Sequence, residues 1–358
     1  MKYEYWFANI KGITGRRKLE IRNMFQSSKD IYYIEEKELE RHIFNETERK
    51  TILENAKTWN VDKEYKEVLR RGVKCVPIWD EEYPKRLRYI HQPPYMLYVK
   101  GRLPQPNRKT VAIVGARECS PYGEYMARTF AETLAQAGVQ IISGMARGVD
   151  SAAQRGAIEA GGTSFGILGC GVDICYPREE IELYMELQES GGLLSEFPIG
   201  IGPLKQNFPA RNRIISGLSD VVLVMEAKER SGSLITADMA LDQGKDVYAL
   251  PGPVNSMLSR GCNRLIKQGA GILLSPQELL EEIGISETSL QKNEPEEKIL
   301  LETTENIVYS CLGLTPQNLS ELMRRTKLSV PELLDVLVRL QVMGLAKEVS
   351  KNYYVKVK

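Results

Sequence analysis

The chain is short of the residues from which many catalytic and metal sites are built. It has only two histidines, His42 and His91, and its six cysteines are scattered without a C-x-x-C pair. A zinc site needs clustered ligands at regular spacing, so none is expected. We expect the cysteines to be small buried side chains in a reducing compartment, with Cys170 and Cys175 as the one close pair that leaves this interpretation open.

The chain also lacks an excess of either charge. Lys+Arg at 48 nearly balances Asp+Glu at 47, so any nucleic-acid site must be a local patch rather than a basic coat. No run of about 18 apolar residues occurs, and the N-terminal segment lacks the apolar core of a signal peptide. We therefore expect a cytoplasmic protein. Its 358 residues, 42% of them hydrophobic, suit a globular protein of two or three domains.

Several nucleotide and hydrolase motifs are missing as well. There is no GxxxxGK[ST], and Gly115 is followed by Arg117 where a dinucleotide fold has glycine. Residues 162–166 match G-x-S-x-G, but Ser164 opens an expected strand and no histidine follows residue 91, so we attribute the match to chance. No cofactor, metal or catalytic residue is therefore expected.

What the chain does have, from residue 110 onward, is a regular alternation of apolar runs and helix-like segments. The runs of strand length are 111–116, 139–144, 163–169, 192–196, 220–226, 246–252 and 271–275. The helix-like segments are 121–137, 149–160, 178–190, 234–243 and 262–269. This pattern indicates a mainly parallel sheet covered on both faces, a doubly wound α/β fold whose ligand lies at the carboxyl ends of the strands.

The composition of the sequence and the spacing of its apolar residues divide the chain into four regions. We predict a helical N-terminal domain at 1–70, the α/β domain at 71–285, a polar linker at 286–298 and a winged helix at 299–358, where three helices precede a hairpin. In the first region, the turn 12–15 with the cations after it could offer backbone N–H groups to a phosphate, or it could be an ordinary helical hairpin.

The segment 205–219, KQNFPARNRIISGLS, suggests a ligand. It places Lys205, Arg211 and Arg213 within nine residues, with Phe208 and Asn212 among them. Cations beside an aromatic ring suit a strand of nucleic acid, which offers phosphates to the cations and base faces to the ring. The apolar residues that follow read as the buried face of a helix, so the cations would lie near its N-terminus.

A second cluster of glycines and cations lies at the expected strand ends. Residues 143–150, SGMARGVD, run from a strand into a helix, and such a turn can cradle a phosphate with Ser143 and Arg147. A tight turn with Arg147 paired to a carboxylate is the alternative. The loop 231–236 opens another helix, but Glu226 and Glu229 precede it and would repel DNA, so we expect this loop at the rim.

Seven motifs share their order and spacing with a known family. They are VAIVGAR, IISGMARGVDSAA, GILGCGVDICYP, LLSEFPIG, NFPARNRIISGLS, SGSLITADMALDQGKDVYALPG and RGCNRLIKQGA. Over roughly residues 73–285 the chain resembles the DNA-processing protein A (DprA/Smf) family of bacterial recombination mediators. The resemblance implies an extended Rossmann-like fold without catalytic activity, a homodimer, binding of single-stranded DNA, and loading of RecA onto incoming strands in natural transformation.

The resemblance also implies site residues. The DNA-binding residues would be Arg117, Ser143, Gly144, Arg147, Lys205, Phe208, Arg211, Asn212 and Arg213. The cations would neutralise phosphates, Ser143 and Gly144 would donate to them, and Phe208 would stack on a base. Gln154 departs from the family, which usually has a histidine near this position. The dimer interface is predicted at Leu265, Ile266 and Ile272, with ordinary core as the alternative.

Two other functions compete with strand binding. Related folds include phosphoribohydrolases with a PGGxGTxxE segment whose glutamate serves catalysis, but SGSLITADMA has Ala237 and Asp238 where that acid would be sought. A duplex-binding regulator could act through the winged helix. Its third helix carries Glu332, Asp335 and Arg339, which is too acidic for strong binding in the major groove.

Overall fold

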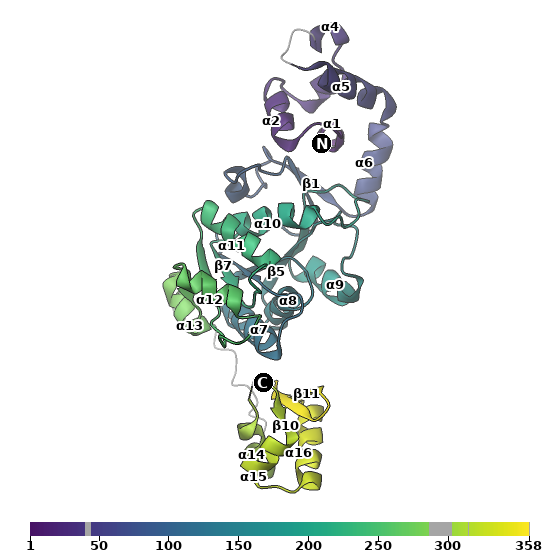
Figure 1. The fold of residues 1–358 in the computed structure, drawn as a ribbon. Helices are drawn as coiled ribbons and strands as arrows, with labels where there is room; N and C mark the ends of the chain where they lie inside the picture. The colour runs from purple at the N-terminus through teal and green to yellow at the C-terminus, as the bar shows by residue number, and fades with distance from the viewer. Residues whose placement is uncertain (40–43, 286–302, 314, 358) are drawn as a thin grey trace.

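A computed structural model describes residues 1–39, 44–285, 303–313 and 315–357. A sheet covered by helices lies at its centre (Figure 1). The sheet has nine strands in the order β1-β2-β6-β5-β4-β3-β7-β8-β9. The strands are β1 Lys74–Pro77, β2 Met96–Gly101, β3 Thr110–Val114, β4 Gln140–Ser143, β5 Thr163–Ile167, β6 Gly192–Ser195, β7 Val221–Val224, β8 Asp246–Ala249 and β9 Gly271–Ile272. The predicted linker, 286–298, lies outside the described residues.

All seven apolar runs form strands of the parallel part of the sheet, as predicted. Neighbouring strands from β6 through β9 pair in parallel, while β2 pairs antiparallel with both β6 and β1. Along the chain, the strands after β3 extend to one side as far as β6, and β7 then pairs on the other side of β3. The order of strands therefore reverses beside β3, which is where open α/β sheets bind ligands.

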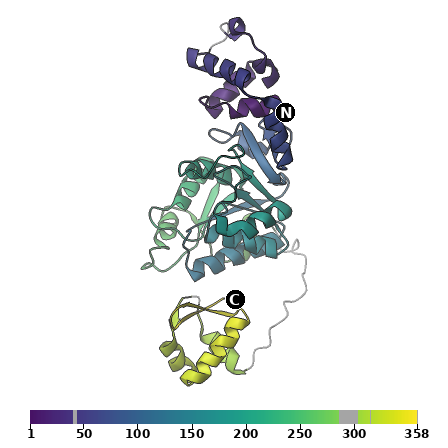
Figure 2. The ribbon, with the colours of Figure 1, turned by 90° about the vertical axis from the view of Figure 1, so that its right-hand side faces the viewer.

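Helices cover both faces of the sheet (Figure 2). They are α7 Pro121–Gln136, α8 Val149–Glu159, α9 Ile181–Ser190, α10 Asn207–Leu218, α11 Gly232–Asp242, α12 Arg260–Lys267 and α13 Pro276–Glu282. Alternate residues of β3 supply the two cores: Ala112 packs in the cluster containing α10 to α12, and Ile113 in the cluster containing α7, α8 and α13. The doubly wound, Rossmann-like fold is confirmed.

The first seventy residues are helical and share a core with the β1–β2 hairpin. The helices are α1 Lys2–Asn9, α2 Gly15–Asn23, α3 Ser28–Tyr32, α4 Glu36–Leu39, α5 Glu46–Thr58 and α6 Val61–Arg70. Trp6 and Ile52 are fully buried with Tyr98 of β2 in this core. In the turn before α2, the Thr14 side chain accepts from the Arg17 N–H, and Arg17 forms an ion pair with Glu48 at 2.8 Å. An ordinary capped helical hairpin accounts for this turn.

The C-terminal part is a winged helix, as predicted. It consists of α14 Thr303–Cys311, β10 Gln317–Asn318, α15 Leu319–Thr326, α16 Val330–Val342, β11 Ala346–Ser350 and β12 Tyr353–Lys356. The second helix begins only at Leu319 because β10 occupies the two residues before it and pairs with β12. Among the described residues, no helix has both the length and the apolar character needed to cross a membrane.

Candidate nucleic-acid interface

A cavity of about 270 Å³ opens where the loops after β3 and β4 meet the start of α10. Its lining residues, which we call the strand-end pocket, are Arg117, Glu118, Gly144, Met145, Ala146, Arg147, Tyr176, Pro177, Phe208 and Arg211. The pocket lies over the carboxyl ends of β3 and β4, next to the point of strand reversal on the other side of β3. Five of the nine predicted DNA-binding residues line it, although they come from three separate segments of the chain.

An aromatic ring beside two guanidinium groups is the main feature of this pocket. The Cζ atoms of Arg117 and Arg211 lie 5.6 Å and 6.0 Å from the centroid of the Phe208 ring. The ring packs so closely on Gly169 that a Cβ there would come within 2.9 Å of it. Tyr176, whose centroid lies 5.5 Å away, extends the aromatic surface and is 40% exposed. Sequence reasoning missed Tyr176, although it lies in one of the seven motifs, one residue before its end.

Arg211 is a buried cation held by backbone carbonyls. It is 4% exposed and donates to the carbonyl of Gly144 at 2.8 Å and to that of Ile167, while its Nε has no partner among the described residues. Burial lowers its pKa to about 10, although the nearby Asp150 opposes this shift. Arg211 therefore remains protonated near neutral pH.

The two groups predicted to donate to phosphate are engaged inside the protein. The Ser143 hydroxyl is fully buried and donates to the carbonyl of Ile113 at 2.6 Å. The Gly144 N–H donates to Asp150 at 3.1 Å, and burial raises the pKa of that carboxyl. A Cβ on Gly144 would meet Arg211 Nη1 at 2.4 Å, so this glycine leaves room for the guanidinium. Both residues support the pocket rather than offer free donors to it.

The other predicted DNA-binding residues differ in how freely their side chains could contact DNA. Arg147 is paired with Glu179, as the alternative interpretation had it, but both side chains are 60% exposed, and such pairs contribute little. Lys205 is exposed two residues before α10, and within the described parts of the chain it has no carboxylate partner. Asn212 donates to the carbonyl of Gly232, at the start of α11.

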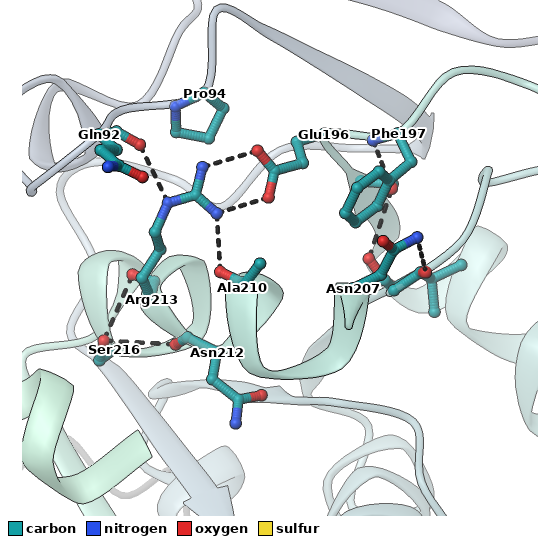
Figure 3. A network of polar contacts seen from close by, with 12 residues as sticks. Gln92, Pro94, Glu196, Phe197, Asn207, Ala210, Asn212, Arg213 and Ser216 are labelled. Atoms are coloured by element: carbon teal, nitrogen blue, oxygen red, sulfur yellow. Dashed lines mark hydrogen bonds and ion pairs between the residues drawn. The ribbon is translucent and has the colours of Figure 1, made fainter. Parts of the chain in front are cut away.

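Arg213 does not line the pocket, and its guanidinium contacts Glu196 and Gln92 (Figure 3). It donates to both carboxylate oxygens of Glu196, at 2.5 Å and 2.6 Å, and to the carbonyl of Gln92 at 3.0 Å. Its side chain is only 14% exposed. Two residues on a helix differ by about 200° in direction, so Arg211 and Arg213 cannot face one ligand. The ion pair between Arg213 and Glu196 therefore holds α10 against the end of β6.

The residues of the predicted dimer interface differ in exposure. Leu265 is buried and belongs to the core beneath α12, and Ile266 is partly buried against the same core. Ile272, on the edge strand β9, is 48% exposed. The interface stays a prediction, and Ile272 is the residue of the three that is most available for it.

Features that could support an enzyme lie elsewhere or are inaccessible. The Ser164 hydroxyl is fully buried and donates to the carbonyl of Ile141 at 3.1 Å, so it cannot act as a nucleophile. Asp238 lines a separate cavity with Lys245 and Asp246, at the start rather than the end of β8. It is therefore remote from the strand-end pocket.

A larger cavity, of about 670 Å³, lies at the opposite ends of the parallel strands, beside the start of β3. Two of the cations that line it are already neutralised: Lys74 pairs with Glu82, and Arg86 pairs with Asp220 at 2.9 Å. The strand-end pocket is smaller, but it combines exposed cationic charge with aromatic rings at the ligand-binding edge.

The fold and the pocket together define a Rossmann-like α/β protein with a cationic, aromatic-lined strand-end site and a winged helix. Comparison with known families agrees. Residues 74–284 match the family model for DNA recombination-mediator protein A, and residues 292–350 match that for the DprA winged helix domain. The first match covers more than half of the sequence, so the chain belongs to the DNA recombination-mediator protein A family, and the resemblance seen in the seven motifs is confirmed.

Individual relatives show the same relationship. The chain is 48% identical over 209 residues to Protein Smf of Escherichia coli, which covers 58% of this chain and 56% of that protein. It is 38% identical over 226 residues to DNA processing protein DprA of Bacillus subtilis, covering 63% and 75% of the two chains. The match thus spans little more than half of the length of the E. coli relative.

Two solved structures are similar as well. The X-ray structure of DNA processing protein A from Streptococcus pneumoniae has a TM-score of 0.68 and 32% identity, and covers 79% of this chain and 98% of that chain. A structure that describes the single-stranded DNA binding mode of DNA processing protein A from Helicobacter pylori has a TM-score of 0.53 and 31% identity, covering 59% and 95%.

Proposed function

We propose that this protein binds single-stranded DNA in the strand-end pocket and acts as a recombination mediator. The observation that carries the proposal is the Phe208 ring beside the guanidinium groups of Arg117 and Arg211. A base can stack on the ring while the neighbouring phosphates contact Arg117 and Lys205. The H. pylori relative, for which a single-stranded DNA binding mode is described, supports this assignment.

The size and chemistry of the pocket favour an unpaired strand over a duplex. Its volume of about 270 Å³ lies just below the range of sites that enclose a whole drug-sized ligand, so it suits one unit of a longer chain. In a duplex each base face is covered by its neighbours, and stacking on Phe208 would require the base to leave the helix, at a cost of a few kcal/mol.

The finer parts of the proposal concern assembly and use. We infer that the protein works as a homodimer in the cytoplasm and delivers the bound strand to RecA during natural transformation or related DNA processing. The exposed Ile272 at the sheet edge is the side chain on which the dimer proposal rests most directly. The membership in the recombination-mediator family supports the delivery to RecA.

A binding titration tests the DNA-binding part. Labelled oligo-dT and a duplex of the same length are titrated with the protein at two salt concentrations. The proposal predicts preferential binding of the single strand, weakened by salt and by Arg117→Ala. Equal affinity for strand and duplex would contradict it.

A filament assay tests the delivery part separately. RecA assembly is followed on oligo-dT that has been coated with a single-strand-binding protein, with and without this protein. We expect the wild-type protein to shorten the lag and Arg117→Ala to leave it unchanged. A wild-type protein that binds the strand but leaves the lag unchanged would reject RecA delivery while leaving strand binding intact.

A further inference from the structure

A second group of cations lies outside the strand-end pocket. It consists of Lys228 and Arg230, in the loop after β7, and Arg260, Arg264 and Lys267, on α12, and we call it the basic ledge. All five side chains are exposed. Across the described ranges of the chain, none of them forms an ion pair, in contrast to Arg147 and Arg213.

The backbone brings the two parts of the ledge together. The N–H of Gly261 donates to the carbonyl of Ala227 at 2.8 Å, and the N–H of Ala227 donates to that of Leu258 at 2.7 Å. A Cβ on Gly261 would meet the carbonyl of Lys228 at 2.8 Å. The start of α12 therefore rests directly against the loop after β7, with Gly261 beside the backbone of Lys228.

The cations of α12 form a single row. Arg260, Arg264 and Lys267 are four and three residues apart, so they project from one face of the helix. Seven residues of helix span about 10 Å, which is roughly three nucleotides at ~3.4 Å per nucleotide of one strand. The row is long enough to follow a backbone rather than a single phosphate.

The ledge is also connected to the pocket. Asn212 lies on α10, next to the pocket residue Arg211, and its side chain donates to the carbonyl of Gly232 at 3.3 Å. Gly232 begins α11, two residues after Arg230. The path from the pocket to Arg230 thus runs along the loops at the carboxyl ends of the parallel strands. From Arg260 the row on α12 then continues toward the start of β8, where Gln268 lines the separate cavity.

Of the two acids that led us to expect the loop 231–236 at the rim, one is not available to repel DNA. Glu226 is 3% exposed and turned inward, where it accepts from the hydroxyl of Ser120 at 2.6 Å and from its N–H at 2.7 Å. Burial raises the pKa of this carboxyl. Of these two acids only Glu229 is exposed, and it lies beside the five cations of the ledge.

We propose that the basic ledge is a second contact for the same polynucleotide, and that it holds the phosphates of the nucleotides beyond those bound in the strand-end pocket. The ledge itself has no aromatic side chain, so it binds the backbone without stacking on bases. This inference rests on the proposed function, because the ledge extends a path that begins at Phe208.

Strand length separates the two contacts experimentally. Oligo-dT of about 5 nucleotides occupies the pocket alone, whereas oligo-dT of about 20 nucleotides also reaches the ledge. Both are titrated by fluorescence anisotropy over a range of salt with the wild-type protein and with the triple variant Lys228→Ser, Arg230→Ser and Arg260→Ser.

The expected result is specific to the longer strand. Each lost phosphate contact lowers the slope of log affinity against log salt by ~0.7, so the triple variant should lose about 2 from the slope and roughly a hundredfold in affinity at 0.1 M salt. Its affinity for the short strand should change less than about twofold. The double variant Arg264→Ser with Lys267→Ser should lower the slope for the long strand by roughly 1.4.

A matched control removes equal charge at the other edge of the sheet. Arg102, Arg108 and Lys109 lie at the end of β2 and just before β3, beside the amino-terminal ends of the parallel strands. Changing all three to serine should leave both strands bound as in the wild type. Equal losses in the control and ledge variants, or an unchanged slope in the ledge variant, would overturn the ledge. A wild-type protein that binds neither strand would instead overturn the proposed function itself.

Discussion

Removing the aromatic ring of Phe208 should weaken strand binding without changing its dependence on salt. The ring carries no charge, and the Cζ atoms of Arg117 and Arg211 lie 5.6 Å and 6.0 Å from its centroid. Stacking of one base on an aromatic side chain contributes about 1–3 kcal/mol, so Phe208→Ala should raise the Kd by about 5- to 150-fold. Because the ring releases no counterions, the salt slope should stay at its wild-type value, whereas Arg117→Ala should lower it by ~0.7.

Two further variants separate stacking from packing. Phe208→Leu keeps an apolar side chain against Gly169 and Tyr176 but presents no ring face, so its affinity should fall almost as far as that of the alanine variant. In the double variant with Arg117→Ala, the losses should not add fully, since a cation near an exposed ring contributes about 0.5–1 kcal/mol that either single change already removes.

Fluorescence anisotropy with labelled oligo-dT at four or more salt concentrations provides both the Kd and the slope for each variant. Thermal unfolding confirms that each variant is folded. If Phe208→Ala lowers the slope as much as Arg117→Ala does, the assignment of a stacking role to the ring is refuted. A Phe208→Leu variant that binds like the wild type would refute it as well.

Three further changes test how the structure supports the site. Gly144→Ala should cost about 1–3 kcal/mol of stability and weaken strand binding, because the new Cβ displaces Arg211; denaturant unfolding and anisotropy measure the two effects. Arg213→Ala should cost about 2–3 kcal/mol, since it leaves the largely buried Glu196 unpaired, but should leave the salt slope unchanged. Burial lowers the pKa of Lys18 to about 8, so between pH 7.5 and 9.5 the unfolded state binds more protons, and the free energy of unfolding should rise by about 2 kcal/mol relative to Lys18→Met.

Each of these expectations has a control. Gly202 has no atom within 4 Å of an added Cβ, so Gly202→Ala should be neutral, and equal losses in the two glycine variants would contradict the steric argument. Glu196→Gln should destabilise the protein to a similar extent as Arg213→Ala. A lower salt slope in Arg213→Ala would show that Arg213 contacts the DNA after all. The Lys18 effect is followed by the fluorescence of Trp6 and Trp59, and an equal pH dependence in Lys18→Met would refute it.

The fold could be predicted from the sequence because its signals are local. The apolar runs from residue 111 onward are buried on both faces and alternate with helical segments, so their pattern alone defines a doubly wound sheet. The winged helix could be predicted from three segments with helical spacing of apolar residues, followed by a terminal hairpin. The short strand β10 gives no such local signal, because it is only two residues long and pairs with a strand some 35 residues later.

The site was predictable only in part, because it depends on partners distant in the chain. The segment 205–213 reads as one basic cluster, but α10 begins at Asn207 and turns Arg211 and Arg213 to opposite sides. The hydrogen bonds of Ser143 and Gly144 are made to groups that only the fold brings near them. Tyr176 enters the pocket from a loop more than thirty residues before Phe208.

Photo-cross-linking tests the position of the strand most directly. Oligo-dT that contains 5-iodo-deoxyuridine is irradiated with the full chain, and the cross-linked peptide is identified by mass spectrometry. The proposed function predicts attachment at Phe208 or Tyr176, and loss of the attachment at position 208 in the Phe208→Leu variant at equal occupancy of the strand. Attachment confined to the winged helix or to the N-terminal helices, with Phe208 and Tyr176 unmodified, would contradict it.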